Sequence, residues 1–148
     1  MQPADQDFAQ RTRASFERQQ AMKTIGASLG AIEPGRVVIE LPYSPALTQQ
    51  HGFLHAGIIA TALDSACGYA AFTLMPHDSG ILTIEYKINL VAPGKGSLFR
   101  MEGQVIKPGR TITVVEGRAF AIDGGKEKLI ATMTATEMTI TGRDDVKH

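Results

Sequence analysis

The sequence lacks the features that mark several large classes of protein. Its 148 residues include one cysteine, Cys67, which excludes an internal disulfide and any metal or iron–sulfur site built on several cysteines. Fifteen Lys and Arg balance fifteen Asp and Glu, and this zero net charge argues against a general nucleic-acid binder. No apolar run reaches the roughly 18 residues of a membrane-spanning helix, and residues 1–13 show no apolar core of a secretory signal. We therefore expect a cytoplasmic protein without nucleic-acid or membrane partners.

The composition is that of one globular domain. Hydrophobic residues make up 43% of the chain and charged residues 20%, with no repeat and no internal linker. We expect a single domain over residues 1–148. Residues 1–24 are expected to be an N-terminal extension with a helix over 7–22, and residues 142–148 a flexible tail.

One segment predicts a long buried helix. Residues 56–75 are rich in Ala and Leu, contain no proline and are apolar on all sides, so we expect this helix to end before Pro76. Before it, residues 25–32 and 36–42 predict a strand pair joined by a turn at 33–35. Residues 43–55 are expected to form a loop or a short helix.

After this helix the chain predicts strands. Residues 82–90 alternate, so Leu82, Ile84, Tyr86, Ile88 and Leu90 are expected to share one face, without a break. Turn signals separate further strands over 97–107, 111–122 and 129–140. The order predicts an α+β fold in which one antiparallel sheet wraps one helix. Such a sheet leaves surface uncovered, which favours a symmetric dimer.

Asp64 is the most unusual residue of the expected helix, because its neighbours are almost all apolar. An ionised carboxylate is costly to bury without partners. Asp64 therefore either makes a structural hydrogen bond or lies on a wet strip of the helix, or it faces a cleft as a general base or nucleophile.

The start of the same helix carries His55, Ala56 and Gly57. First-turn N–H groups have no partner within a helix and lie at the positive end of its dipole. A glycine there suits either a crowded helix start or the approach of a carbonyl oxygen to be polarised. Gly57 and Asp64 are separated by about 10 Å along the helix, too far to reach one carbonyl carbon. Two helices packed antiparallel across a dimer axis would bring one of each together.

Other chemistries have weak signals. His51 and His55 lack a third ligand at a credible spacing, so no metal site is expected. Cys67 lies in an apolar helix, where a thiol is usually inert. No nucleophile-elbow, phosphate-loop or dinucleotide motif occurs. The turns at 93–95 and 107–110 carry basic residues that could lie near one another and suit a phosphate-bearing ligand, although ordinary solvated turns look the same.

Three segments together resemble the hot-dog-fold acyl-CoA thioesterases of the phenylacetate-degradation type. They are HGFLHAGIIATALDSACGYAA, TIEYKINLVAPGKG and VIKPGRTITVVEG, within residues 35–140. The resemblance implies a long helix wrapped by a curved antiparallel sheet of five to six strands. It also implies a homodimer with shared active sites, or a tetramer of two dimers. The implied reaction is hydrolysis of an acyl- or aryl-acyl-CoA to the acid and coenzyme A, without metal or organic cofactor.

The resemblance also assigns roles to residues. Asp64 matches the family's helix carboxylate, and Thr83 matches a Ser/Thr position opposite it. His55, Ala56 and Gly57 match an H-G-G motif in which Ala56 replaces the first glycine, and Gln49 stands where the family often has Asn. Regions implied to contact substrate or CoA contain Gln50, His51, Leu90, Pro93, Lys95, Lys107, Gly109, Arg110 and Thr111.

Two alternatives remain open. A hot-dog enoyl-thioester hydratase uses an Asp–His or His–Glu pair, for which His51 is the nearby candidate. A non-catalytic acyl or CoA binder is compatible with the departures at Ala56 and Gln49. The acyl group is not specified, since Phe53, Tyr69, Phe72 and Met75 suit either a pocket or the core.

Overall fold

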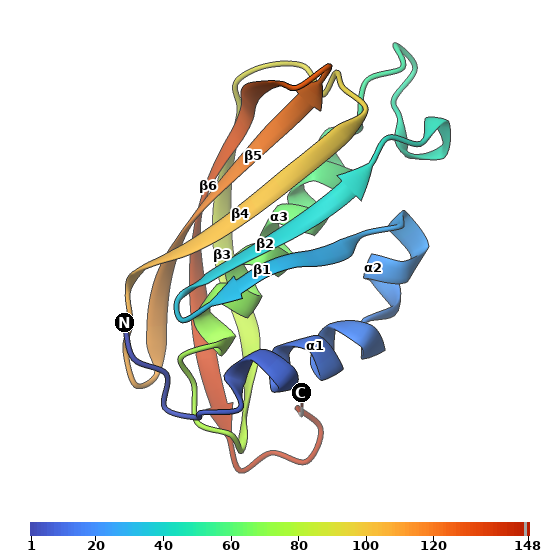
Figure 1. Ribbon diagram of the computed structural model, residues 1–148. Coiled ribbons are helices and arrows are strands. Elements are labelled where there is room, and N and C mark those ends of the chain that lie inside the picture. The colour runs from blue at the N-terminus through green and yellow to red at the C-terminus, as the bar shows by residue number, and fades with distance from the viewer. Residues whose placement is uncertain (147) are drawn as a thin grey trace.

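A computed structural model, which describes residues 1–146 and 148, shows a six-stranded antiparallel sheet curved around one long helix (Figure 1). The sheet order is β1-β2-β4-β5-β6-β3. The expected α+β class is confirmed. The elements are α1 (Phe8–Arg18), α2 (Gln20–Ile25), β1 (Ser28–Glu33), β2 (Arg36–Pro42), the short 3-10 helix η1 (Pro45–Leu47), α3 (Ala56–Phe72), β3 (Ser79–Leu90), β4 (Leu98–Lys107), β5 (Ile112–Asp123) and β6 (Lys126–Thr141).

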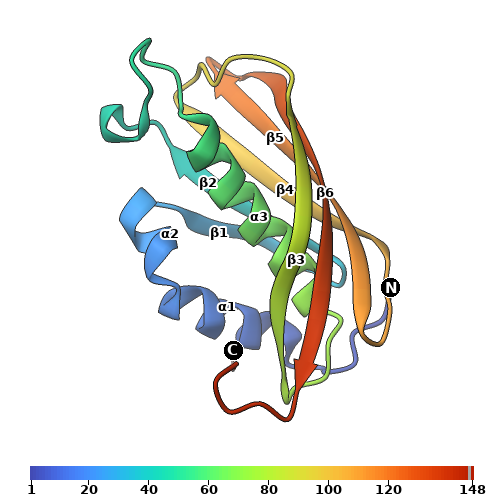
Figure 2. The same cartoon turned by 180° about the vertical axis from the view of Figure 1, so that it is seen from behind.

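Helix α3 is buried against the concave face of the sheet (Figure 2). Gly103 of β4 and Gly117 of β5 are directly paired in the sheet. A Cβ on Gly103 would lie 2.3 Å from the Ala66 carbonyl oxygen, and one on Gly117 would lie 2.8 Å from Cys67 Sγ. This glycine pair therefore lets the backbone of α3 lie directly on the sheet at Ala66 and Cys67, which fixes the position of the helix.

The end of α3 differs slightly from the expected boundary at residue 75. Regular α-helix ends at Phe72, and Leu74 and Met75 donate their N–H groups three residues back. Such bonds tighten the last turn ahead of Pro76. Arg11 of α1 donates to the carbonyl oxygens of Phe72 and Met75, at 3.1 and 2.9 Å. The N-terminal extension thus caps the C-terminal end of the long helix.

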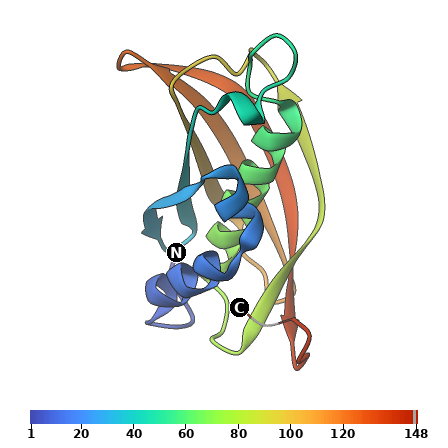
Figure 3. The same ribbon diagram turned by 90° about the vertical axis from the view of Figure 1, so that its right-hand side faces the viewer.

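The N-terminal region forms two helices rather than the one expected over 7–22. Gln19 has an extended backbone and separates α1 from α2, and α2 continues to Ile25, so β1 begins only at Ser28. The two helices lie across α3 on the side away from the sheet (Figure 3). His148 returns to this region, where its Nδ1 lies 2.9 Å from Ser15 Oγ. Lys147 lies outside the described residues, and the expected flexibility of 142–148 stays a prediction.

Strand β3 corrects the expectation that residues 82–90 alternate without a break. Thr83 pairs with Glu137 and Glu85 pairs with Thr136, so Ile84 is an extra residue in a β-bulge. Side chains therefore change faces between Thr83 and Glu85. Thr83 points to the helix side of the sheet, as do Tyr86, Ile88 and Leu90, whereas Leu82 points to the opposite side. The sequence pattern does not show the bulge because polar and apolar letters still alternate.

Candidate active site

The start of α3 is shaped by an imidazole cap. His55 Nδ1 accepts a hydrogen bond from the Gly57 N–H at 2.8 Å. A Cβ on Gly57 would lie 3.1 Å from that nitrogen, so glycine keeps the space for the ring. The N–H groups of Ile58 and Ile59 bond to the His55 carbonyl. Among the described residues none accepts from the Ala56 N–H, which leaves this exposed group as the open donor of the first turn.

Gln49 lies beside this helix start. Its Oε1 accepts from the His51 N–H at 2.6 Å and from the Phe53 N–H at 3.3 Å. These two backbone donors fix the orientation of the amide and leave Nε2 without an acceptor among the described residues. An open pocket of about 440 Å³ joins the predicted residues Gln49, Ala56, Leu90 and Pro93, and is also lined by Phe53, Leu54, Ile59, Val91, Ala92 and Gly94.

Asp64 lies two turns further along α3 in a different pocket. Its Oδ1 accepts a hydrogen bond from Thr83 Oγ1 at 2.9 Å, and Thr83 faces the helix because it pairs with the inward-facing Glu137. Burial raises the pKa of the half-buried Asp64 carboxyl, and the Thr83 hydrogen bond offsets part of this rise. The pocket has a volume of about 180 Å³ and is lined by Gln19, Asp64, Ser65, Gly68, Tyr69, Ile81, Leu82, Thr83, Glu137 and His148.

Glu137 is a residue of this pocket that the sequence analysis missed. Its side chain is 0% exposed, and its Oε2 lies 3.0 Å from Thr83 Oγ1. The pKa of Glu137 is raised to about 7, mainly by burial, with a part of the rise offset by the Thr83 hydrogen bond and a smaller rise caused by the charge of Asp64. A signal was present in the sequence, because Glu137 continues the inward series Ala131, Met133 and Ala135 along β6. Strict alternation therefore places this carboxyl inside.

The two pockets share no lining residue, so Asp64 and Ala56 of one chain do not face the same cavity. This separation agrees with the spacing expected along the helix. It leaves a donor site at one end of α3 and a carboxylate site near its middle.

The two basic turns lie at opposite ends of the sheet, which corrects the expectation that they could be neighbours within one chain. The ten residues of β4 separate Lys95 from the turn that contains Lys107, Gly109, Arg110 and Thr111. At about 3.3 Å per residue this strand spans roughly 30 Å.

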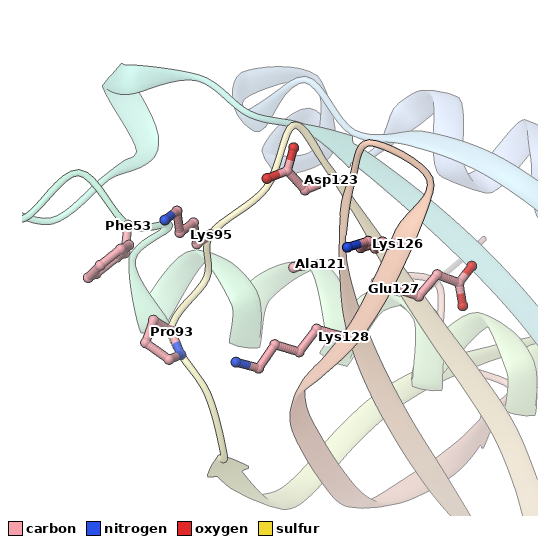
Figure 4. Close-up of a pocket in the computed structure, with 8 residues that line it drawn as sticks. All are labelled: Phe53, Pro93, Lys95, Ala121, Asp123, Lys126, Glu127 and Lys128. Atoms are coloured by element: carbon pink, nitrogen blue, oxygen red, sulfur yellow. The ribbon is translucent and has the colours of Figure 1, made fainter.

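Lys95 instead lies near the β5–β6 hairpin. It lines an open pocket of about 510 Å³ with Phe53, Pro93, Ala121, Asp123, Lys126, Glu127 and Lys128 (Figure 4). Three lysines from two separate segments surround this pocket. Lys126 and Lys128 were missed in the sequence, because charged residues at a hairpin normally indicate only a solvated turn.

The remaining candidates are dispersed. Gln50 and His51 are exposed in the loop before α3. Tyr69, Phe72 and Met75 belong to the buried core, and Phe53 lines pockets. Cys67 is buried, and burial raises the pKa of its thiol far above the usual value. Within residues 1–146 and 148 no cluster of three potential metal ligands forms, and none of the helices described there could span a membrane.

Comparison with known proteins defines the class. Residues 51–128 match the sequence profile of the Thioesterase superfamily, and the chain belongs to this family. A protein of Saccharolobus solfataricus with a provisional esterase name is 38% identical over 105 residues, covering 71% of this chain and 74% of the relative.

Solved structures identify the fold as the hot-dog fold. A thioesterase family protein from Silicibacter pomeroyi superposes with a TM-score of 0.90 and 53% identity, covering 91% of this chain and 99% of the other. The Escherichia coli PaaI protein from the phenylacetic acid degradation operon gives a TM-score of 0.81 at 19% identity, covering 92% and 95%. The expected hot-dog thioesterase family is therefore confirmed, the likeness to PaaI shows a shared fold, and thioester hydrolysis is the general reaction that this family supports.

Proposed function

We propose that the protein is an acyl-CoA thioesterase whose active site combines Asp64 of one subunit with the α3 start of a second copy. This proposal rests on one observation: the expected carbonyl-binding donors and the expected catalytic carboxylate lie in two separate pockets of one chain. One pocket offers open donors at Ala56 and Gln49, and the other offers a carboxylate held by Thr83. An antiparallel two-fold pair of α3 helices joins one pocket of each kind, twice.

The α3 start is the proposed site for the thioester carbonyl oxygen. The open Ala56 N–H lies at the positive end of the helix dipole, and the His55 cap holds the first turn in place. Gln49 Nε2 is a second donor whose direction its own loop fixes. Both donors are in place before charge develops on the oxygen, which is the requirement for stabilising the tetrahedral transition state.

Asp64 then supplies the reacting oxygen by one of two routes. As general base it takes a proton from water, whose oxygen attacks the carbonyl carbon. As nucleophile it attacks that carbon itself, and water hydrolyses the resulting anhydride. In both routes the C–S bond breaks, the electron pair leaves with sulfur, and the thiolate of CoA is protonated. Neither route uses a metal ion or an organic cofactor.

The second copy is supported by the edge of the sheet. β3 ends the sheet, and it exposes Leu82, Ile84, Tyr86 and Leu90 at 47%, 52%, 44% and 49%. An edge strand of this length that is both unpaired and apolar favours pairing with another chain. Antiparallel β3–β3 pairing is the isologous contact that a two-fold axis provides. We propose this dimer, alone or doubled to a tetramer, as the active form.

The lysine pocket at the β5–β6 hairpin is the proposed anchor for the phosphates of CoA. Lys95, Lys126 and Lys128 line it together with Asp123 and with Glu127, whose carboxylate is paired with Arg100, and Pro93 lines both this pocket and the one at the α3 start. The two pockets are therefore neighbours, as one extended ligand would require. Lys107 and Arg110 lie at the far end of the same chain, so any contact they make to CoA comes from the partner subunit.

Free-thiol release from acetyl-, hexanoyl-, lauroyl-, phenylacetyl- and hydroxybenzoyl-CoA tests the proposed reaction. Release of CoA with formation of the free acid supports it and ranks the acyl groups. Hydration of an enoyl-CoA without thiol release would favour the hydratase alternative. His148 is the histidine that lines the Asp64 pocket, but both of its ring nitrogens are hydrogen-bonded. CoA binding without turnover would favour the non-catalytic binder.

A further inference from the structure

The hydroxyl of Thr83 lies between two carboxyl groups. Its Oγ1 is 2.9 Å from Asp64 Oδ1 and 3.0 Å from Glu137 Oε2. A hydroxyl has one proton to donate. If both carboxyls were ionised, one of these two contacts would bring two oxygens together without a hydrogen between them. The geometry therefore requires that one carboxyl carries a proton and donates it to Thr83.

Burial decides which carboxyl is protonated. Glu137 is 0% exposed and its Oε1 has no hydrogen-bond partner among the described residues, whereas Asp64 is half-buried at the mouth of the pocket. A buried carboxylate without compensating donors is strongly disfavoured. The ionisable groups nearby are Asp64, Cys67 and Tyr69 of α3, His148, and Arg18 of α1, whose charge acts on Tyr69 and His148, while β3 and β5 present Thr83 and Thr113. No lysine or arginine of the described chain lines this pocket to neutralise a charge on Glu137.

We propose that Glu137 is a positioning residue that acts through Thr83. Its protonated carboxyl donates to Thr83 Oγ1, so the single hydroxyl proton of Thr83 is directed to Asp64. This arrangement holds the Asp64 carboxylate in one orientation and keeps a second negative charge away from the reacting carbonyl. The inference rests on the proposed role of Asp64 in thioester hydrolysis. It predicts that activity decreases when Glu137 loses its proton, in the neutral pH range.

Glu137→Gln and Glu137→Leu separate this role from simple packing. Glutamine keeps the shape and an N–H donor toward Thr83 but cannot ionise, whereas leucine cannot donate. We expect Glu137→Gln to retain kcat within about threefold at pH 6 and to lose the decrease above neutral pH. Glu137→Leu should lose about tenfold or more in kcat at all pH values, with KM little changed. Glu116→Gln is the matched control, since Glu116 is also a strand glutamate, on β5, but alternates with the buried Val115 and Gly117 and so lies on the opposite face of the sheet.

A readout independent of turnover distinguishes failure of this inference from failure of the proposed function. The infrared carbonyl band of a protonated carboxyl should be present in the wild type at pH 6, titrate near neutral pH, and be absent in Glu137→Gln. Absence of this band in the wild type would overturn the inference whatever the activity. An unchanged high-pH decrease in Glu137→Gln, or a loss of kcat equal to that of Glu137→Leu, would overturn it as well. Thermal unfolding of each variant establishes that it is folded.

Discussion

Gly57 donates its N–H to Nδ1 of His55, and this contact closes the first turn of α3 with a side chain instead of a substrate. The open donor of that turn is then the Ala56 N–H. The alanine in place of a glycine at residue 56 therefore leaves the needed donor intact. The imidazole acts as an N-cap, and the glycine at 57 makes room for it.

Loss of this cap should lower both stability and activity. We expect His55→Ala to reduce the free energy of unfolding by about 1 kcal/mol, the usual effect of losing an N-cap. It should also lower kcat, because the Ala56 N–H is no longer held. Gly57→Ala should act in the same direction by displacing the ring. Urea unfolding and steady-state kinetics measure both effects, with His77→Ala as the control. An unaltered kcat in His55→Ala would contradict this role of the cap.

Removal of the Thr83 hydroxyl should change the pH profile at its acidic side. The hydrogen bond from Thr83 lowers the pKa of Asp64, so Thr83→Ala raises that pKa further. The ionised, active form then appears only at higher pH, and the rising limb of the plot of kcat/KM against pH shifts to higher pH. Thr83→Ser keeps the hydroxyl and should keep the wild-type limb. Equal profiles for the alanine and serine variants would show that the hydroxyl does not act on Asp64.

Glu137 should make folding stability depend on pH. In the folded protein its pKa is about 7, against an ordinary value of 4.5. Between these values the folded state holds more protons, so the free energy of unfolding decreases as pH rises. The total decrease is about 3 kcal/mol. The stabilising effect is complete below pH 4.5 and is lost as pH rises through 7.

Urea unfolding of the wild type and of Glu137→Gln at pH 5.5, 6.5 and 8 measures this contribution. The difference between the two proteins removes the effects of the groups that do not interact with Glu137. We expect the free energy of unfolding of Glu137→Gln, measured relative to that of the wild type, to be higher at pH 8 than at pH 5.5. A difference that is constant with pH would mean that Glu137 is ionised throughout.

Much of the fold could be predicted from sequence periodicity. The apolar segment of α3 and the alternation in β4, β5 and β6 are long enough to fix the type and order of the elements. The bulge at Ile84 could not be predicted, because one extra residue leaves the pattern of letters intact. Nor could the break at Gln19, since no glycine or proline marks it, and the side-chain amide of Gln19 bonds Ser65 of α3, a contact that only the folded chain brings about.

The candidate site was predicted only in part. The pairing of Asp64 with Thr83 was implied by family resemblance, and the structure places the two in hydrogen-bond contact. Glu137 was missed because a glutamate in an alternating strand is normally assigned to the solvent face. The reverse occurs at this point of β6, where Met138 is 36% exposed and Glu137 is buried. The lysines of the β5–β6 hairpin meet Lys95 only in three dimensions.

Neutralising the lysine pocket should weaken binding of the nucleotide part of the substrate. We expect Lys126→Ala combined with Lys128→Ala to raise KM for acyl-CoA about tenfold, with little change in kcat, because the phosphates lie far from the reacting carbon. The same acyl group on pantetheine lacks the nucleotide and should be hydrolysed equally by both proteins. Added salt should raise KM for acyl-CoA in the wild type more than in the variant. An equal loss on both substrates would place the effect elsewhere.

A charge introduced on the free edge of β3 should have two effects at once: it should separate the subunits, and it should abolish activity. Ile84→Lys places an ammonium group at the proposed two-fold contact, where its partner would lie opposite. Ile106→Lys, on β4 and equally exposed, is the control. Sedimentation velocity gives the mass and thiol release gives the activity. A folded monomer that retains full activity would exclude a site shared between subunits.

Asp64→Asn tests the central claim most directly. The substitution keeps the shape of the side chain and its contact with Thr83, but it removes the negative charge that either route requires. We predict that CoA release falls by at least about a thousandfold, while thermal unfolding and the calorimetrically measured affinity for CoA stay near the wild-type values. Release at the wild-type rate by a folded Asp64→Asn protein would contradict the assignment of Asp64 as the reacting carboxylate.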